Sequence, residues 1–386
     1  MNYIIIGNGI AGTEAALNIR KNDESGSITI ITDSVNLHYY RPRLVDYLSG
    51  DTTLEKFTTY DEEFYEKNNI INKLNTTVSS IDTKKQTVLT DKGESIEYDK
   101  LLLATGARAF VPPITGADKK GVFTLRTAAD TKEIKDFSEG INDIVVIGGG
   151  LLGIENANSL MKLGKNLTVI EAVDWLLPRQ LDKDGGNTLQ GLLEEKGLKF
   201  ILKDSVASID GDHAVSSITL KSGKKIETHA VVISAGIRCN LELAQASGIT
   251  CNLGIVVNDQ METSVKNIYG AGDVIEHDSK VYGLWAPAKE QGAVAGANMT
   301  GLNETYSGST ISTVLKVTGI DLFSSGDIHS LDGTIKSDST DSTYKKLITD
   351  KNGTQSAIVV GDKKSISVAR KIIAGKAEAE DFFSEN

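Results

Sequence analysis

The same short pattern occurs twice in this chain: an apolar run, a glycine-rich turn and a helix-like stretch. The apolar runs are residues 3–6 and 144–147, and the glycines that follow are Gly7, Gly9 and Gly12 in the first copy and Gly148, Gly150 and Gly153 in the second. Between a strand and a helix, the first glycine allows a sharp turn, the second lets the backbone approach a pyrophosphate, and the third lets helix and strand pack closely. Two copies in this context predict two dinucleotide-binding units.

An acidic residue ends the next strand-like run after each turn: Asp33 in the first copy and Glu171 in the second. A carboxylate roughly 20 residues beyond the glycines accepts hydrogen bonds from ribose hydroxyls. The alternative is a solvated carboxylate at a strand end, and in the first copy Ser34 or the backbone could serve the ribose instead. No arginine follows Glu171 directly, so this copy predicts a preference for a nucleotide without a 2′-phosphate.

Composition narrows the class of protein. The chain has 386 residues, enough for two or three domains, and its net charge of −11 opposes a general role on nucleic acid or an anionic membrane. No apolar run approaches the length of a membrane span, and the first strand-like run begins at Tyr3, which leaves no room for a signal peptide. Cys239 and Cys251 form no CxxC pair. We therefore expect a cytoplasmic protein.

The organisation along the chain predicts an α/β fold with two Rossmann-like domains, one inserted in the other, plus a C-terminal α+β domain. A buried strand ends in Ala104, Thr105 and Gly106, and a second one ends similarly at residues 234–236. Prolines at 112 and 113 mark a crossing between domains. We expect the first domain over residues 1–108 and 234–303, the inserted domain over 109–233 and the C-terminal domain over 304–386. The last contains a strand-like run at 313–317 and a hairpin signal at 350–353.

Two further segments carry candidate functional residues. Residues 37–44 include Arg41-Pro42-Arg43, which cannot form a core strand and predict a functional loop before a helix. Residues 266–274 include Gly272 and Asp273 and precede a helix expected from about Ala288 to Met299, with Pro287 near its first turn.

The double fingerprint, the Ala-Thr-Gly strand end and the Tyr-Gly-Ala-Gly-Asp run at 269–273, in this order, resemble the pyridine nucleotide–disulfide oxidoreductase superfamily. The resemblance covers nearly the whole chain and implies FAD in the first domain and NADH in the inserted domain. It implies that the first glycines and residues 104–106 contact FAD, and that Asp273, after Gly272, accepts hydrogen bonds from the ribityl chain. Read without the resemblance, Gly272 and Asp273 could form a plain turn.

The cysteines exclude several branches of that superfamily. Disulfide reductases carry a CxxxxC pair in the first domain, thioredoxin-reductase-like members carry CxxC in the second, and a further group uses one cysteine beyond the first domain's second strand. This chain has no cysteine before Cys239. Only a thiolate performs those reactions, so we exclude them. We expect Cys239 to be a packing residue.

The remaining members pass single electrons to a protein or metal centre. The loop at 40–44 and the segment at 282–291 resemble NADH:rubredoxin reductases and the flavin module of NADH-dependent nitrite reductases. The latter continue into iron–sulfur and sirohaem modules, whose cysteine motifs this sequence lacks. We therefore expect electron transfer from NADH through FAD to rubredoxin or a similar small iron protein. The alternatives are an electron-input component for nitrite reductase or a ferredoxin-type protein, and a non-catalytic flavoprotein that responds to NADH. The oligomeric state is left open.

Four residues are candidates for the electron-transfer chemistry. The resemblance places Glu155 near the nicotinamide, although it could equally be a helix-surface carboxylate. Trp285 either shields the flavin, lies toward the acceptor or simply packs. Arg41 or Arg43 lies near the flavin edge or is a solvated loop residue, and both are candidates, with Lys316, for a basic patch that binds an acidic partner. His38 lies beside this loop, and the five histidines form no metal-ligand pattern.

Overall fold

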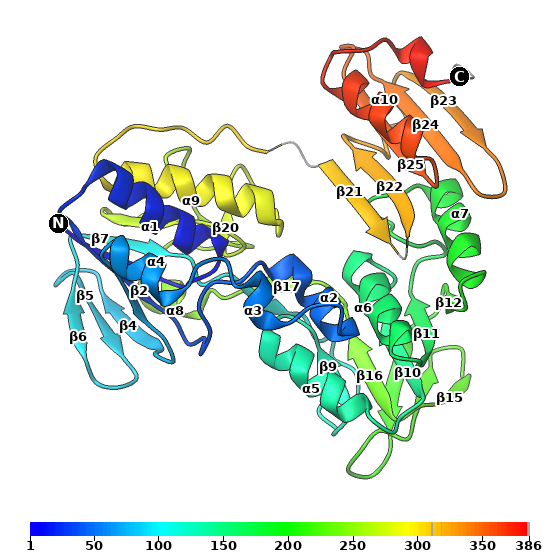
Figure 1. Cartoon of the computed structure of the whole chain (residues 1–386), viewed down its shortest axis with the longest axis horizontal. Coiled ribbons are helices and arrows are strands. Elements are labelled where there is room, and N and C mark those ends of the chain that lie inside the picture. The colour runs from blue at the N-terminus through cyan, green and yellow to red at the C-terminus, as the bar shows by residue number, and fades with distance from the viewer. Residues whose placement is uncertain (310–311, 318, 384–386) are drawn as a thin grey trace. The chain divides into compact units, whose positions relative to one another are not determined.

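A computed structural model describes residues 1–309, 312–317 and 319–383 (Figure 1). The chain forms two compact units, which we call unit 1 and unit 2. Unit 1 comprises Met1–Leu44, Thr52–Arg108 and Ile237–Ser309, and unit 2 comprises Val45–Asp51, Ala109–Gly236 and Thr310–Asn386. The side chain of Lys316, one residue of the expected basic patch, lies outside the described part. The domain boundaries given above stay predictions.

Unit 1 is built on a parallel five-stranded sheet. Its strands are, in spatial order, β19 (Ile268–Gly270), β7 (Lys100–Leu103), β1 (Asn2–Ile6), β2 (Ser27–Ile31) and β3 (Ile70–Lys73). After their first residue, β1 and β2 are buried throughout. Parallel strands covered on both faces read as continuous apolar runs, which is why residues 3–6 show no alternation.

Two helices far apart in sequence lie side by side in unit 1: α1 (Ile10–Asn22) and α9 (Trp285–Met299) (Figure 1). A Cβ at Gly292 would collide with the backbone of Ala11, and one at Gly296 with the backbone of Ala15. Glycine is unfavourable inside a helix, and close helix contact is the reason it occurs twice here.

Helix α9 begins earlier than predicted. It starts at Trp285, not near Ala288, and ends at Met299 as expected. Pro287 is consequently its third residue, where a missing N–H costs no hydrogen bond, since the first four N–H groups of a helix have no partner within the helix.

The smaller elements of unit 1 complete its surface. They are η1 (Arg41–Arg43), α3 (Leu54–Phe57), α4 (Glu62–Lys67), α8 (Glu242–Ala246), the antiparallel sheet β4 (Val78–Asp82), β5 (Thr87–Thr90) and β6 (Ser95–Glu97), and the pair β18 (Ile255–Val256) and β20 (Ile275–Glu276). Strands β8 (Ala107–Ala109) and β17 (Ile237–Cys239) lie where the chain leaves unit 1 and returns to it.

Unit 2 repeats the parallel architecture. Its sheet has the order β12 (Lys199–Leu202), β11 (Asn166–Glu171), β10 (Asp143–Ile147), β16 (Ala230–Ile233) and β9 (Val122–Thr124). The associated elements are α5 (Ala128–Ser138), α6 (Leu151–Lys162), α7 (Lys183–Glu194) and the antiparallel sheet β13 (Val206–Asp210), β14 (Ser217–Leu220) and β15 (Lys225–Glu227). Strand β10 is buried after its first residue, as β1 is.

The C-terminal part of unit 2 is an antiparallel sheet covered by one helix. The strand order is β21 (Ser312–Val317), β22 (Ile320–Ser325), β25 (Gln355–Val360), β24 (Tyr344–Thr349) and β23 (Thr334–Ser339), and α10 (Lys363–Ile373) and η2 (Ala379–Phe382) follow. The hairpin signal at 350–353 is confirmed, because β24 and β25 pair antiparallel on either side of it.

A short segment near the N-terminus also belongs to unit 2. Residues 45–51 form most of helix α2 (Leu44–Ser49) and pack on α6. The Ser159 hydroxyl donates to the Val45 carbonyl over 2.8 Å, and Lys162 pairs with Asp51 at 2.7 Å. The chain therefore passes between the units five times before residue 311. Among the helices of the described ranges, none is long and apolar enough to cross a membrane.

Candidate functional site

The first glycine turn has the geometry that a pyrophosphate needs. Gly7 has φ +110°, and a Cβ there would collide with the Ala104 carbonyl. A Cβ at Gly12 would collide with the Gly7 carbonyl, whereas a Cβ at Gly9 would meet no described atom within 4 Å. Gly9 is the N-cap of α1, and no described side chain caps the helix there. The free N–H groups of α1 thus face open space, which fits an anionic group.

The second turn repeats this arrangement in unit 2. Gly148 has φ +115°, and a Cβ there would collide with the Ser234 carbonyl. A Cβ at Gly153 would collide with the Gly148 carbonyl, while the space beside Gly150 is open to 4 Å within the described part of the chain. Gly150 is the N-cap of α6, again without a capping side chain from a described residue. Both turns therefore fit a dinucleotide, and the assignment of each glycine to a contact stays a prediction.

Glu171 is held in place by hydrogen bonds, one of them from the second glycine turn. Its carboxylate accepts from the Gly149 N–H at 2.7 Å and from the Val173 N–H at 2.9 Å. Each carboxylate oxygen can accept a further hydrogen bond, so both remain able to accept from a ribose diol. Its role as ribose acceptor is a prediction that this geometry suits.

Asp33 occupies a different environment. It is exposed and lies just after β2. A different residue, Asn8 in the first glycine turn, connects that turn to the segment that follows β2. The Asn8 amide donates to the Asn36 carbonyl at 2.8 Å and accepts from the Thr32 hydroxyl at 3.2 Å. Our sequence reasoning missed Asn8, although a polar residue between the first two glycines is a visible signal. The ribose role of Asp33 stays a prediction.

The strand end at Ala104, Thr105 and Gly106 is tied to the returning chain by Asn240. Asn240 donates through its side chain to the Thr105 carbonyl at 2.9 Å and through its backbone to the Gly106 carbonyl at 3.0 Å. The Thr105 hydroxyl in turn donates to the Asn240 carbonyl at 3.2 Å. Asn240 was also missed, because these contacts join residues far apart in sequence.

The Gly272–Asp273 turn lies against α1 and α9. Gly272 has φ +87°, and its N–H donates to the buried Gln291 side chain at 3.0 Å. Asp273, half-buried, follows at the end of this turn. The Cys239 thiol donates to the Asp273 carbonyl at 3.1 Å, and burial raises the pKa of Cys239, with Asp273 adding to the shift. Cys239 is thus a buried, protonated thiol rather than a nucleophile.

An aromatic cluster connects the Arg41–Arg43 turn with the start of α9. His38 stacks on Trp285 with ring centroids 5.5 Å apart, and Tyr40 meets Trp285 edge-on at 4.7 Å. Burial, with the nearby Arg41 charge, lowers the pKa of His38 to about 4, so the imidazole is neutral at pH 7. Its Nε2 atom is buried without a partner among the described residues. Tyr40 is 42% exposed, so this cluster reaches the surface of unit 1.

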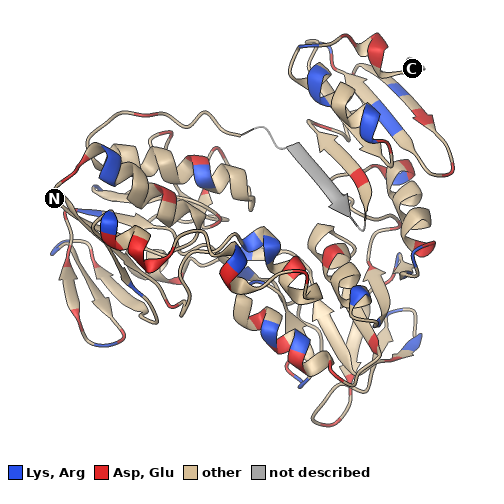
Figure 2. Cartoon of the chain, in the orientation of Figure 1, with Lys and Arg blue, Asp and Glu red and all other residues tan. Residues whose placement is uncertain are grey.

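The two arginines of the turn differ in exposure. Arg43 is exposed and Arg41 is half-buried. Elsewhere in both units, acidic and basic residues are interspersed (Figure 2). The contribution of either arginine to a flavin contact or a docking patch stays a prediction.

Glu155 lies half-buried on α6 in unit 2. Burial raises the pKa of Glu155 to about 7, and the charge of Asp46, from the segment that packs on α6, adds to the shift. Both protonation states are therefore populated near neutral pH, which suits a residue that holds or releases a proton. Asp46 was not anticipated from the sequence.

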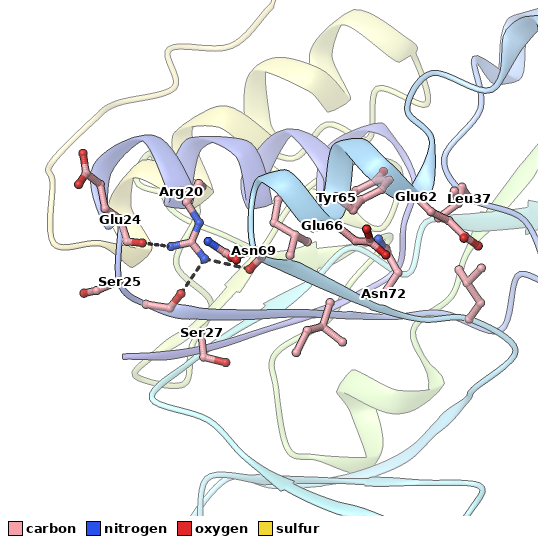
Figure 3. A pocket seen from close by; sticks show the side chains of 14 residues that line it. Arg20, Glu24, Ser25, Ser27, Leu37, Glu62, Tyr65, Glu66, Asn69 and Asn72 are labelled. Carbon is pink, nitrogen blue, oxygen red and sulfur yellow. Dashed lines mark hydrogen bonds between the residues drawn. The ribbon is translucent and has the colours of Figure 1, made fainter.

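A separate cavity lies elsewhere in unit 1. This groove has a volume of about 820 Å³ and lies beside α4 and β3. Arg20 lies at one end of it (Figure 3). Arg20 donates all five of its N–H groups to backbone carbonyls, at 2.7–3.0 Å. A guanidinium has no further donor, so Arg20 is structural and does not recruit an anionic ligand.

The chain is similar to proteins of one known family over most of its length. Residues 1–292 match the family described as pyridine nucleotide-disulphide oxidoreductase, and residues 312–377 match the rubredoxin NAD+ reductase C-terminal domain. The chain is 40% identical to the nitrite reductase (NAD(P)H) of Bacillus subtilis over 93% of this chain, but it spans only 45% of that protein. It is 33% identical to the NADH-rubredoxin oxidoreductase of Clostridium acetobutylicum, covering 93% of this chain and 90% of that one.

Two solved structures share this architecture. The crystal structure of that Clostridium enzyme has a TM-score of 0.84 and 31% identity, covering 99% of this chain and 97% of the other. A NAD-dependent persulfide reductase from A. fulgidus has a TM-score of 0.90 and 30% identity, covering 99% and 78% of the two chains. These similarities confirm the predicted α/β fold and small C-terminal domain.

Proposed function

The chain belongs to the pyridine nucleotide-disulphide oxidoreductase family, and we propose that it moves hydride from NADH to FAD and then single electrons to rubredoxin. One observation carries this proposal: two uncapped helix starts, each beside an open glycine, occur in a chain without a cysteine before Cys239. FAD and NAD(H) are the cofactors of this family, and bound FAD accepts a hydride and gives its electrons up one at a time.

Unit 1 provides the FAD site in this proposal. The N–H groups at the start of α1 bind the pyrophosphate, and Asp273 accepts from the ribityl chain. Helix α9 begins at Trp285 without a capping side chain from the described residues, so its N–H groups can stabilise negative charge on a reduced flavin. The neutral His38 ring fixes Trp285 at that helix start by stacking on it.

Unit 2 provides the NADH site. The start of α6 binds the pyrophosphate, and Glu171 accepts from the adenosine ribose. A 2′-phosphate would meet the Glu171 charge, so NADPH is the poorer substrate. Glu155, with its pKa near neutrality, holds a proton beside the nicotinamide.

The acceptor is proposed on two grounds. Residues 312–377 match the rubredoxin NAD+ reductase C-terminal domain, and the chain covers 90% of the Clostridium NADH-rubredoxin oxidoreductase. An electron acceptor must also reach the flavin from the protein surface, and the exposed Tyr40 beside Trp285 offers such a surface in unit 1. Arg41 and Arg43, in the same turn, supply positive charge for an acidic partner.

A second candidate is an electron-input component for nitrite reductase. The 40% identity to the Bacillus nitrite reductase favours it, and this chain corresponds to less than half of that protein. The two candidates share every step up to the acceptor. They differ only in which iron protein takes the electrons.

A panel of purified acceptors separates the candidates. NADH oxidation is measured with rubredoxin, a ferredoxin, a sirohaem nitrite reductase module, lipoamide and glutathione disulfide at equal concentrations. The proposal predicts the highest kcat/KM for rubredoxin and negligible rates for both disulfides. Preference for the sirohaem module would move the second candidate ahead, and failure with every acceptor would indicate a non-catalytic flavoprotein.

A further inference from the structure

The loop at residues 172–182 joins Glu171 to helix α7, and the C-terminal sheet packs on that helix. Asp182, the last residue of the loop, is the N-cap of α7 and accepts from the Gly185 N–H at 3.1 Å. The same carboxylate accepts from the Tyr344 hydroxyl at 2.8 Å and from the Lys346 ammonium at 2.9 Å. Two side chains of β24 therefore hold the end of this loop, and α7 contacts both β24 and β25 (Figure 1).

This junction is well shielded from water. The side chains of Lys346 and Asp182 are 12% and 19% exposed, and Tyr344 is 3% exposed. A Cβ at Gly185 would lie 3.0 Å from the Tyr344 ring, so helix and strand are in close contact. A charge pair in such a place is screened less than one at the surface, and leaving either partner alone is unfavourable.

A second contact reaches the middle of the loop. The His329 Nε2 atom lies 2.9 Å from the Pro178 carbonyl. Within the loop, the Trp175 indole donates to the Leu181 carbonyl at 3.1 Å. The loop is therefore attached to the C-terminal sheet at two places and braced internally between them.

The other side of the loop touches the nucleotide-binding turn. The Leu177 N–H donates to the Gly149 carbonyl at 3.0 Å, and the Gly149 N–H donates to Glu171 at 2.7 Å. Leu177 is fully buried and has φ +53°, a left-handed conformation that a leucine adopts only where its surroundings enforce it. A continuous set of contacts thus runs from β24, through the loop, to the Glu171 carboxylate.

We propose that Tyr344 and Lys346 are positioning residues for the adenosine half of NADH. By holding Asp182, they keep loop 172–182 in the conformation that places Gly149 and Glu171 for the pyrophosphate and ribose. The inference rests on the proposed role of Glu171, and it assigns the C-terminal sheet a part in coenzyme binding.

The test compares NADH with reduced nicotinamide mononucleotide, which delivers the same hydride but lacks the adenosine half. The FAD-loaded full chain is assayed with ferricyanide as acceptor, so the result does not depend on rubredoxin. The variants are Tyr344→Phe, Lys346→Met and Lys346→Arg. Lys345→Met is the matched control, because Lys345 lies on the opposite face of β24 and pairs with Asp338 at 3.6 Å.

We expect Lys346→Met to raise the KM for NADH about tenfold, as loss of a hydrogen bond to a charged group does, with kcat unchanged. Tyr344→Phe should also raise the KM for NADH. Lys346→Arg keeps the positive charge, so it should keep the KM of the parent protein. None of the variants should change the constants for reduced nicotinamide mononucleotide, and Lys345→Met should leave both substrates unaffected.

Three results would overturn the inference. They are an unchanged KM for NADH in both loss-of-contact variants, an equal loss with the two substrates, and the same effect in Lys345→Met. A wild-type chain that reduces ferricyanide but not rubredoxin would contradict the proposed acceptor and leave this inference standing.

Discussion

The two glycine turns have the same arrangement of glycines, but a different side chain lies beside each turn. In each, the first and third glycines lie against backbone carbonyls and the second faces open space. In unit 2 the turn is closed by Glu171, which accepts from Gly149 and Val173. In unit 1 it is closed by Asn8, a neutral side chain that bonds to Thr32 and Asn36, while Asp33 is exposed.

This difference teaches where nucleotide selectivity resides. The helix start binds any pyrophosphate, because backbone N–H groups carry no information about the rest of the ligand. In unit 2 the Glu171 carboxylate is held beside the turn, and we propose that its negative charge discriminates between a ribose and its 2′-phosphate. The turn of unit 1 has no equivalent carboxylate at that place among the described residues, so selection there depends on other contacts, for which Asp33 and Asp273 are the proposed residues.

The largest effect on cofactor binding should come from replacing the third glycine of either turn, Gly153 or Gly12, by a residue with a side chain. Gly153→Val places a side chain against the Gly148 carbonyl, and an overpacking penalty of about 1–3 kcal/mol on the NADH-binding conformation corresponds to a roughly 5- to 160-fold loss of NADH affinity. The variant should stay yellow and be reduced by dithionite but slowly by NADH. Gly12→Val should instead lose FAD. Flavin absorbance and stopped-flow reduction measure both, and a Gly153→Val protein without FAD would break the comparison.

The next effect separates the two acidic residues. Glu171→Gln should lower kcat/KM for NADH about tenfold, because a charged acceptor for the ribose is lost, and should narrow the preference over NADPH. Asp33→Asn should instead lower FAD affinity, because the exposed Asp33 is the predicted ribose acceptor of unit 1. Initial rates with both nucleotides and FAD titration test the pair. Equal kcat/KM for NADH and NADPH in the parent protein would contradict the role of Glu171.

Much of this comparison could be predicted from the sequence, and its limits are physical. Each glycine turn lies within one short segment between a strand and a helix, so the spacing of the glycines was enough to predict both turns. Asn8, Asn240 and the junction at Asp182 could not be predicted, because each joins segments that meet only after folding. Likewise, Gly292 and Gly296 read as unfavourable within a helix until α1 is placed against them.

Opposite pH dependences should distinguish the units. The lowered pKa of His38 means that the unfolded chain binds its proton more readily, so unit 1 loses stability as the pH falls from about 6.5 to 4. The raised pKa of Glu155 means that the unfolded chain ionises more readily, so unit 2 loses stability as the pH rises from about 4.5 to 7.

The size of each effect on the free energy of unfolding is at most about 3.4 kcal/mol, since one pKa unit is worth about 1.4 kcal/mol and each pKa lies about 2.5 from its ordinary value. Glu155→Gln should be more stable than the parent at pH 8 and equal to it at pH 4.5, and His38→Gln should resist acid better if it retains FAD. Calorimetry with FAD fluorescence measures both. Identical pH profiles for parent and Glu155→Gln would show that this carboxyl is not shifted.

The smallest effect concerns the turn at Arg41–Arg43. Arg43→Glu should slow rubredoxin reduction a fewfold, about the contribution of one exposed charge to association, and the effect should shrink as salt rises. Flavin reduction by NADH should not change. Steady-state rates at low and high ionic strength measure this, and a salt-independent parent rate would contradict an electrostatic docking site.

The central claim is that electrons pass from NADH through FAD to rubredoxin without a thiol. It is tested most directly with the Cys239→Ser/Cys251→Ser double variant in an anaerobic stopped-flow experiment. One equivalent of NADH should bleach the flavin, and rubredoxin should reoxidise it at nearly the parent rate, because Cys239 is a buried, protonated thiol whose pKa burial raises. Loss of reoxidation in this variant, or reoxidation by rubredoxin no faster than by a dye, would contradict the account.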